Sequence, residues 1–218
     1  MRVVPASVLL ALLLGFFGST LLDGGPAGRP LDLPSGGRGA DEEQDEDAPE
    51  VIVFYGAEFE SDAFFWCLDR SGSMSGHKIV VLKEELTGAI DQLSRQAEFG
   101  IVAYNGSVIR FSEAPVRARR AEKTRAREWV NELLAHGSTR LAAPSAEILR
   151  ISQLSRKKNK RIIMVGDAAP QDADAAISTI EDLNHESTPF DCLLISGISD
   201  LFEEIAAMTG GTFRVLGP

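Results

Sequence analysis

The sequence is poor in the residues that build disulfide scaffolds and zinc sites. Among 218 residues it has two cysteines, Cys67 and Cys192, and three histidines, His77, His136 and His185. Two cysteines are too few for a disulfide scaffold, and each lies in an apolar run, which favours two small buried side chains. The histidines are too far apart along the chain to indicate zinc. The fold must therefore rest on a hydrophobic core, which a chain of this length can form.

Aromatic residues are missing from the basic stretches of the chain. Residues 117–127 and 156–161 are rich in arginine and lysine, but no aromatic side chain is interleaved with them, and Glu122 interrupts the first. A solvated helix face explains the first cluster, and positive charge at a helix carboxyl end explains the second. We expect no nucleic-acid partner.

The formal net charge of −10 comes largely from one segment, since residues 41–50 hold seven carboxylates. The acidity therefore says little about the folded part of the chain. Residues 23–50 combine this acidic run with a high glycine and proline content. That composition is typical of a disordered linker, which would place the folded domain at residues 51–218.

The first 22 residues are predicted to direct export. They begin with a basic residue, continue through an apolar run at residues 8–17 and then contain small residues, as in a signal peptide. The alternative is an uncleaved membrane anchor, because residues 3–22 could just span a bilayer of about 30 Å. Pro5 and the short central run favour the signal peptide. In either case we expect a secreted, periplasmic or cell-envelope protein, which contacts a membrane only if the anchor is retained.

From residue 51 onward, apolar runs alternate with one-sided helical patterns. This alternation predicts an open, doubly wound α/β sheet that is mostly parallel, with helices on both faces. Asn105-Gly106 predicts a hairpin and one antiparallel edge strand. Asn105-Gly-Ser107 also matches the N-glycosylation pattern, although the turn is a sufficient reason for it. The expected strands are 51–55, 64–68, 99–104, 107–111, 161–167, 190–196 and 212–216, and the expected helices are 78–93, 121–134, 141–154, 172–184 and 200–208.

A polar turn follows the most apolar of these strands. The sequence runs Asp69-Arg-Ser71-Gly-Ser73-Met-Ser-Gly76 directly after residues 64–68. Open α/β folds bind their ligands at the carboxyl ends of such strands. A carboxylate and two hydroxyls are hard oxygen ligands, which suit Mg²⁺ better than zinc or copper.

Two further segments offer oxygen ligands, namely Thr139 in a polar loop and Asp167 at the end of a later strand. With the Asp-x-Ser-Gly-Ser turn, they make residues 63–216 resemble a von Willebrand factor type A domain with its metal-ion-dependent adhesion site. The ending at residues 202–213 resembles the last helix and strand of that family. The resemblance implies a Rossmann-like fold in which Ser71, Ser73 and Thr139 hold Mg²⁺, with Mn²⁺ as a substitute. Asp69 and Asp167 would act through water or through hydrogen bonds to the hydroxyls.

The resemblance also implies a function. A metal ion with few direct carboxylate ligands can accept an Asp or Glu carboxylate from a protein partner, so we expect a monomeric adhesion module. Arg70, His77 and Arg140 would lie on the rim of the site, either as solubilising charges or as contacts for an anionic partner. One departure from the family is that Asp167 is followed by Ala168-Ala169-Pro170 rather than by glycine.

Two simpler or competing interpretations remain. The serines could merely cap the helix from Lys78, although this does not explain Thr139 and Asp167. A phosphatase of the haloacid dehalogenase type also places an aspartate at a strand end, and Asp167 with Asp172 resembles its later acidic motif. Ser71, however, stands where that mechanism needs an acid, and a serine cannot carry its proton at neutral pH. The sequence therefore favours binding over catalysis.

The strand order implied by the family, 3-2-1-4-5-6, also bears on the cysteines. It separates the strands of Cys67 and Cys192 by the strand that ends at Asp167. Strands lie about 4.8 Å apart, so the two backbones would be about 10 Å apart, beyond the reach of a disulfide. We expect both thiols to be unpaired.

Overall fold

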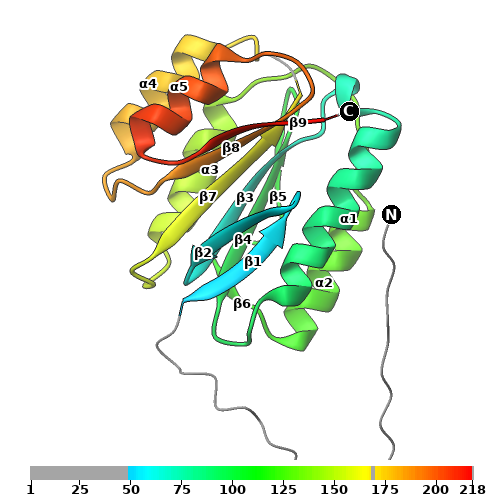
Figure 1. Cartoon of the computed structure of the whole chain (residues 1–218), viewed down its shortest axis with the longest axis vertical. Helices are drawn as coiled ribbons and strands as arrows, with labels where there is room; N and C mark the ends of the chain where they lie inside the picture. Colours follow the sequence, from blue (N-terminus) through cyan, green and yellow to red (C-terminus); the bar gives the residue numbers. More distant parts are fainter. Residues whose placement is uncertain (1–48, 168–169, 218) are drawn as a thin grey trace, which may run out of the picture. The chain divides into compact units, whose positions relative to one another are not determined.

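The structure is a computed structural model, and it describes residues 49–167 and 170–217. The described part contains a central sheet with strand order β5-β4-β3-β7-β8-β9, in which β6 also pairs with β4 (Figure 1). Residues 1–22 and 23–48, the predicted export segment and almost all of the predicted linker, lie outside the described residues. The sheet strands are β3 (Ala63–Asp69), β4 (Glu98–Tyr104), β5 (Val108–Arg110), β6 (Val116–Arg117), β7 (Lys160–Gly166), β8 (Phe190–Ile195) and β9 (Phe213–Leu216).

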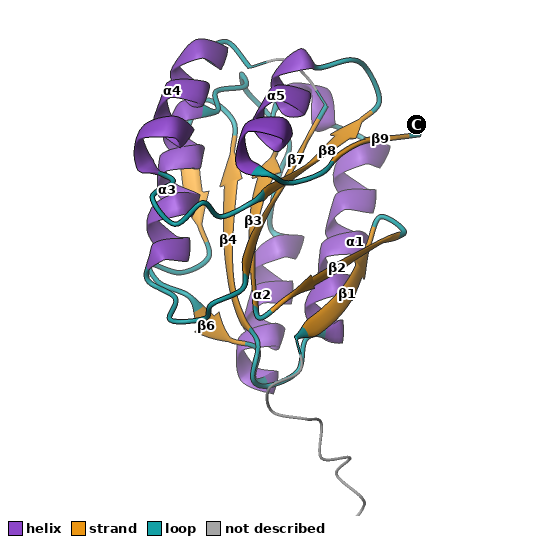
Figure 2. Ribbon diagram, turned by 60° about the vertical axis from the view of Figure 1, so that its left-hand side comes forward, coloured by secondary structure: helices purple, strands orange, loops and turns teal. Residues whose placement is uncertain are grey.

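The helices cover both faces of this sheet, as Figure 2 shows. On one face, α1 and α2 pack over a core that includes Trp66 and Phe99. On the other face, α3, α4 and α5 pack over a second core that includes Phe65 and Met164. Consecutive side chains of a strand point to opposite faces, so a strand between two helical layers must be apolar throughout, as β3 is. The helices are α1 (His77–Gln92), α2 (Arg120–Asn131), α3 (Ala142–Gln153), α4 (Ala173–Leu183) and α5 (Asp200–Thr209).

The predicted fold class and strand order are confirmed. β3 pairs in parallel with both β4 and β7, and β8 pairs in parallel with β7 and β9. β5 is antiparallel to β4, as the Asn105-Gly106 turn predicts. β6 was not predicted, because a strand of two residues is too short to give a pattern.

A separate β-hairpin precedes the sheet. The structure confirms a strand near residues 51–55, which is β1 (Glu50–Phe54), and adds β2 (Ala57–Ser61), which was not predicted. The two strands are antiparallel, and the turn between them has positive φ at Tyr55 (50°) and Gly56 (67°). Such a turn matches the twist of a hairpin. In β2, exposed glutamates alternate with buried residues, and this pattern could have predicted the strand.

Both cysteines are free and buried, as expected. In the sheet register, Cys67 lies beside Met164 and Met164 lies beside Cys192, so β7 separates them. Burial raises the pKa of both thiols, which makes them poor nucleophiles.

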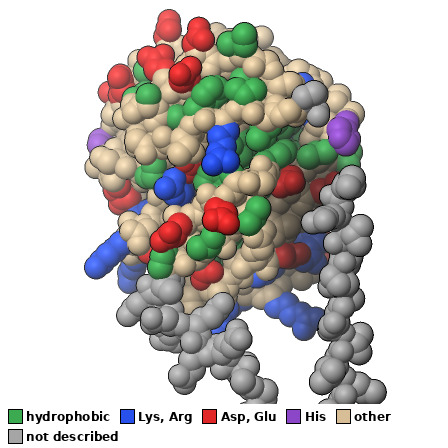
Figure 3. All heavy atoms as spheres, in the orientation of Figure 1, with side chains coloured by type: hydrophobic (Ala, Val, Ile, Leu, Met, Phe, Trp, Pro, Cys, Tyr) green, Lys and Arg blue, Asp and Glu red, His purple; other side chains and the backbone are tan. Residues whose placement is uncertain are grey.

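Several residues of the basic clusters form ion pairs with carboxylates. Arg125 pairs with Glu122, Arg127 with Asp91 and Lys160 with Glu186. On the face shown in Figure 3, charged side chains of both signs are interspersed with hydrophobic ones. Within residues 49–167 and 170–217, no helix has both the length and the apolar character needed to cross a bilayer.

Candidate metal centre

Two aspartates meet at the carboxyl edge of the sheet. Asp69 is the last residue of β3, and Asp167 directly follows the neighbouring strand β7. Gly166 allows this edge to pack closely, since a Cβ there would lie 3.0 Å from Phe202 Cζ and 3.2 Å from the Tyr104 hydroxyl oxygen. The strand order that the family resemblance implies therefore brings both carboxylates to one edge.

Asp69 is fully buried but only half satisfied. Its Oδ1 accepts a hydrogen bond from the Ser71 backbone N–H at 2.6 Å, and its Oδ2 is buried with no hydrogen-bond partner among the described residues. The pKa of Asp69 is raised to about 6, chiefly by burial and to a smaller extent by the nearby charge of Asp167, while contacts with Ser71 and with the Asp167 backbone oppose this rise. An orphaned buried carboxylate oxygen is costly in a folded protein unless a cation or a proton compensates it.

The two serines form a chain of hydrogen bonds that ends on the second aspartate. Ser73 Oγ donates to Asp167 Oδ1 at 2.7 Å, and Ser71 Oγ lies 3.0 Å from Ser73 Oγ. A hydroxyl has a single proton, so Ser71 must be the donor to Ser73. The structure therefore places these four predicted residues in one cluster.

Helix capping does not account for the serines. The short 3-10 helix η1 (Gly72–Met74) follows Ser71, whose side chain makes no capping hydrogen bond. The residue that caps α1 is Gly76, which also contributes no side-chain cap. The buried side chain of Met74 instead anchors the turn in the core. The serine hydroxyls are thus left for the cluster.

Thr139 is brought to this edge by backbone contacts. Gly72 N–H donates to Gly137 O at 3.0 Å, and His136 N–H donates to Arg70 O at 2.8 Å, which ties the Thr139 loop to the serine turn. Gln171 N–H donates to Thr139 O at 3.0 Å, which ties it to the segment after Asp167. The side chain of Thr139 is nearly buried, and its hydroxyl makes no hydrogen bond within the described part of the chain.

Asn105 and Asp172 position this loop, and sequence reasoning did not assign either this role. Asn105 is buried, its Oδ1 accepts from Ser107 N–H at 2.9 Å, and its Nδ2 donates to His136 O at 2.8 Å. The sequence showed it as a turn residue and a glycosylation pattern, but a buried, donating Nδ2 leaves no room for a sugar. Asp172 accepts from Leu141 N–H at 2.7 Å, at the start of α3.

The three residues predicted on the rim of the site, Arg70, His77 and Arg140, differ in their exposure to solvent. Arg70 was expected to be exposed, but it is buried and its Nη1 lies 2.7 Å from His136 Nε2, so it braces the two loops instead of facing a partner. His77 and Arg140 are exposed, as expected. Residues 168–169, where the sequence departs from the family, lie outside the described residues.

Lys78 also reaches this cluster, and no sequence pattern predicted its contact. Its Nζ lies 2.5 Å from Asp167 Oδ2, and the side chains are 33% and 0% exposed, respectively. Both oxygens of Asp167 therefore have a donor, one from Ser73 and one from Lys78.

The donor set fits a hard divalent cation. Among residues 49–167 and 170–217, no three His, Cys, Asp or Glu side chains are grouped so as to hold a metal. The cluster instead offers two carboxylates with the hydroxyls of Ser71 and Ser73, and backbone contacts bring the loop of Thr139 to the same edge. Oxygen-only sets of this kind suit Mg²⁺ or Mn²⁺. The orphaned Oδ2 of Asp69 is the atom that such a cation, or its bound water, would satisfy.

Comparison with known proteins agrees with this architecture. The family model described as von Willebrand factor type A domain matches residues 65–215. A von Willebrand factor type A structure from Catenulispora acidiphila is 23% identical, with a TM-score of 0.63. The match covers 77% of this chain and 45% of the Catenulispora chain. Manganese-loaded TRAP from Plasmodium vivax is 16% identical, with a TM-score of 0.54. The match covers 71% of this chain and 68% of the TRAP chain. At these identities, the two structures show the fold alone.

A curated relative is also found. The mouse (Mus musculus) inter alpha-trypsin inhibitor heavy chain 4 is 28% identical over 96 residues, which are 44% of this chain. The chain spans about a tenth of the length of that relative.

Proposed function

Because the chain belongs to the von Willebrand factor type A domain family, we propose that it is a binding module that captures an acidic side chain of a protein partner through a bound Mg²⁺. Domains of this family generally mediate protein–protein interactions. The partner would offer an Asp or Glu carboxylate. We also propose that the module acts as a monomer.

One observation carries this proposal. Among the residues that the structure describes, the fully buried carboxylate of Asp69 keeps one oxygen without a hydrogen-bond partner beside the hydroxyls of Ser71 and Ser73. A purely structural aspartate would be satisfied by nearby donors. An oxygen left unpaired at a ligand-binding edge of the sheet is what a cation site requires.

We propose different roles for the hydroxyls and the carboxylates of the site. Ser71, Ser73 and Thr139 would supply hydroxyl oxygens to the metal, while Asp69 and Asp167 would orient these hydroxyls or bound waters. With mostly neutral direct ligands, the metal would stay electrophilic and supply the attraction for an incoming carboxylate. The exposed Arg140 would add positive potential at the rim, which makes capture weaker at high salt.

We propose a non-catalytic role. The haloacid dehalogenase alternative has no support, because the aspartate of its later motif, Asp172, is engaged with the backbone N–H groups of Leu141 and Ala142. Ser71 also remains unsuited as an acid. We further propose that the module acts after export, in a secreted, periplasmic or cell-envelope location, as the sequence of residues 1–22 predicts.

Metal-dependent capture is the test of this function. We expect the purified chain to bind Mg²⁺ and Mn²⁺ in calorimetric titrations, and to retain proteins from its own extracellular or periplasmic extract in Mg²⁺ but not in chelator. Asp69→Ala should abolish both effects while the circular dichroism spectrum stays native, because Asp69 lies at the edge of the sheet.

The matched control is Asp182→Ala, which removes an exposed carboxylate on α4. This variant should behave like the wild type. Recovery of the same proteins in Mg²⁺ and in chelator would contradict metal-bridged capture. Phosphate-ester hydrolysis that depends on Asp69 would contradict the non-catalytic role.

A further inference from the structure

Lys78 lies in the first turn of α1, where a positive charge is unfavourable. It is the second residue of α1, and a positive charge in the first turn opposes the helix dipole. The first turn of α1 contains no acidic residue that would compensate it. The position of this ammonium therefore calls for a partner outside the helix.

That partner is one of the two carboxylates of the candidate metal centre. Lys78 Nζ lies 2.5 Å from Asp167 Oδ2, while Asp167 Oδ1 accepts the proton of the Ser73 hydroxyl. The side chain of Asp167 is 0% exposed, so solvent screens this ion pair only from the lysine side. The ammonium thus binds the same carboxylate that orients a candidate metal ligand.

The charges of the site suggest what this contact does. Asp69 and Asp167 carry two negative charges, and Lys78 offsets one of them, while Asp69 Oδ2 has no hydrogen-bond partner within residues 49–167 and 170–217. A divalent cation beside these groups would meet one positive charge already in place. Repulsion between like charges is several times stronger at a partly buried site than in water.

We propose that Lys78 is an internal cation that compensates Asp167 when no divalent metal is bound and lowers the affinity of the site for that metal. The inference rests on the proposed function and adds a regulatory residue to it. With the metal bound, the site would carry one net positive charge, which a partner carboxylate neutralises. Lys78 therefore weakens the binding of metal alone and favours occupancy of metal and acidic ligand together.

The test is a titration of the full-length chain with Mg²⁺ and with Mn²⁺, without any partner. Lys78→Met keeps the length of the side chain and removes its charge, so we expect at least about tenfold tighter metal binding. Lys78→Arg keeps the charge and should stay within about threefold of the wild type. Lys83→Met is the matched control on the same helix, where the ammonium donates to Asn131 O at 2.9 Å, and it should change nothing.

A second measurement covers the case in which Lys78→Met does not fold. Amine-reactive labelling of the wild type, read by mass spectrometry, should increase at Lys78 when Mg²⁺ is added and stay constant at Lys83. Equal or weaker metal binding by a folded Lys78→Met variant would overturn the inference and leave the proposed function standing. If that variant is unfolded, unchanged labelling of Lys78 in the wild type on addition of Mg²⁺ would overturn the inference. Absence of metal binding in both the wild type and Lys78→Met would overturn the proposed function and this inference together.

Discussion

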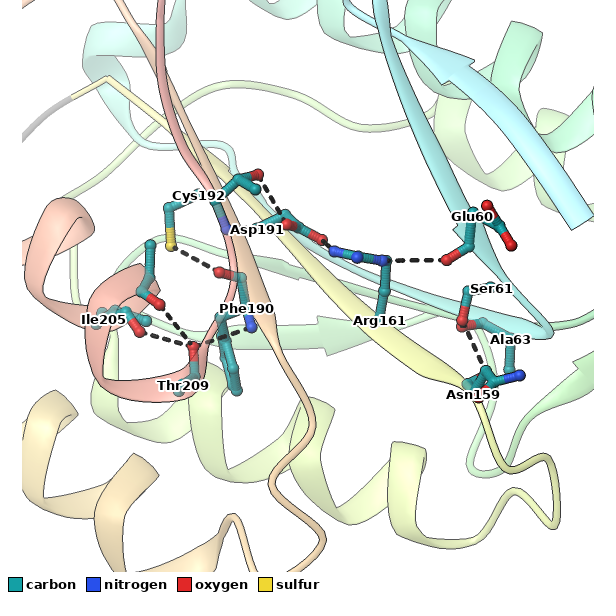
Figure 4. A network of polar contacts seen from close by, with 12 residues as sticks. Glu60, Ser61, Ala63, Asn159, Arg161, Phe190, Asp191, Cys192, Ile205 and Thr209 are labelled. Atoms are coloured by element: carbon teal, nitrogen blue, oxygen red, sulfur yellow. Dashed lines mark hydrogen bonds and ion pairs between the residues drawn. The ribbon is translucent and has the colours of Figure 1, made fainter. Parts of the chain in front are cut away.

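Two fully buried aspartates, on strands of the same sheet that β7 separates, differ in how their carboxylate oxygens are hydrogen-bonded. Asp191, in β8, accepts from Arg161 Nη1 at 2.6 Å through Oδ2 (Figure 4). Through Oδ1 it accepts from Thr212 N–H at 3.0 Å and from Thr212 Oγ1 at 2.8 Å. Asp69, at the end of β3, has one backbone donor on Oδ1 and, in the described part of the chain, none on Oδ2. Both side chains have the same charge and the same burial.

We interpret this difference as that between a structural carboxylate and one that we propose serves a ligand. The ion pair of Asp191 holds β7 and β8 together, and its contacts with Thr212 fasten the start of β9. Leaving a buried carboxylate oxygen unpaired costs free energy, which a protein retains where a ligand later supplies the missing contact. We therefore expect changes at Asp191 to affect stability, and changes at Asp69 to affect binding.

The largest effect is expected at Asp191. Asp191→Ala leaves the Arg161 guanidinium and the Thr212 donors without their acceptor. Removing one partner of a buried ion pair costs about 3–5 kcal/mol, and we expect about 3 kcal/mol, because Arg161 is 30% exposed and can regain water. Urea unfolding, with an unchanged dependence on denaturant concentration, measures this loss.

The double variant Arg161→Met/Asp191→Leu provides the control for that measurement. It removes both charges and fills the space with apolar groups, so it should cost less than Asp191→Ala alone. Metal affinity should stay at the wild-type value in each folded variant. A loss of metal binding in the double variant would show that the two aspartates are not separable.

The next effect is expected at Asp69. Asp69→Asn keeps an acceptor for the Ser71 N–H group but removes the unpaired charge, so stability in chelator should not fall. Loss of a group that orients metal ligands costs about 10–100-fold in metal affinity. The wild type should gain about 2.7 kcal/mol of stability at a metal concentration 100 times its dissociation constant, and the variant much less.

Thermal unfolding in chelator and in Mg²⁺ checks both parts of this prediction. A strong loss of stability in chelator would mean that Asp69 is structural, like Asp191. A full metal-induced gain in Asp69→Asn would mean that the unpaired oxygen does not serve the metal.

The sequence predicts one of these two aspartates far better than the other. Asp69 ends a continuous apolar strand and begins an Asp-x-Ser-x-Ser turn, and both features can be recognised along the chain. Asp191 stands inside an apolar run and its partners, Arg161 and Thr212, are 30 and 21 residues away. Pairing between such distant residues depends on the strand order, which the composition of the run does not contain.

The same reason explains the other differences between prediction and structure. The fold class follows from alternating strands and helices. Asp69, Ser71 and Ser73 were predicted as site residues from a local motif, and Thr139 and Asp167 from the family resemblance. The burial of Arg70 against His136 and the ion pair of Lys78 with Asp167 depend instead on how two loops and a helix meet. An arginine or lysine in a polar turn has the same local pattern whether it is exposed or paired.

The smallest effect is expected at Thr212, where the contact with Asp191 can be reduced by one bond. Thr212→Val keeps the branched shape and the backbone N–H that donates to Asp191 Oδ1, but it removes the hydroxyl donor. Loss of one such hydrogen bond costs about 1 kcal/mol, since Oδ1 keeps a second donor. Thr212→Ser restores the hydroxyl and should recover most of that stability in urea unfolding. If Thr212→Val cost as much as Asp191→Ala, the carboxylate would depend on its hydroxyl partner rather than on Arg161, and the ion pair would not be what holds β7 to β8.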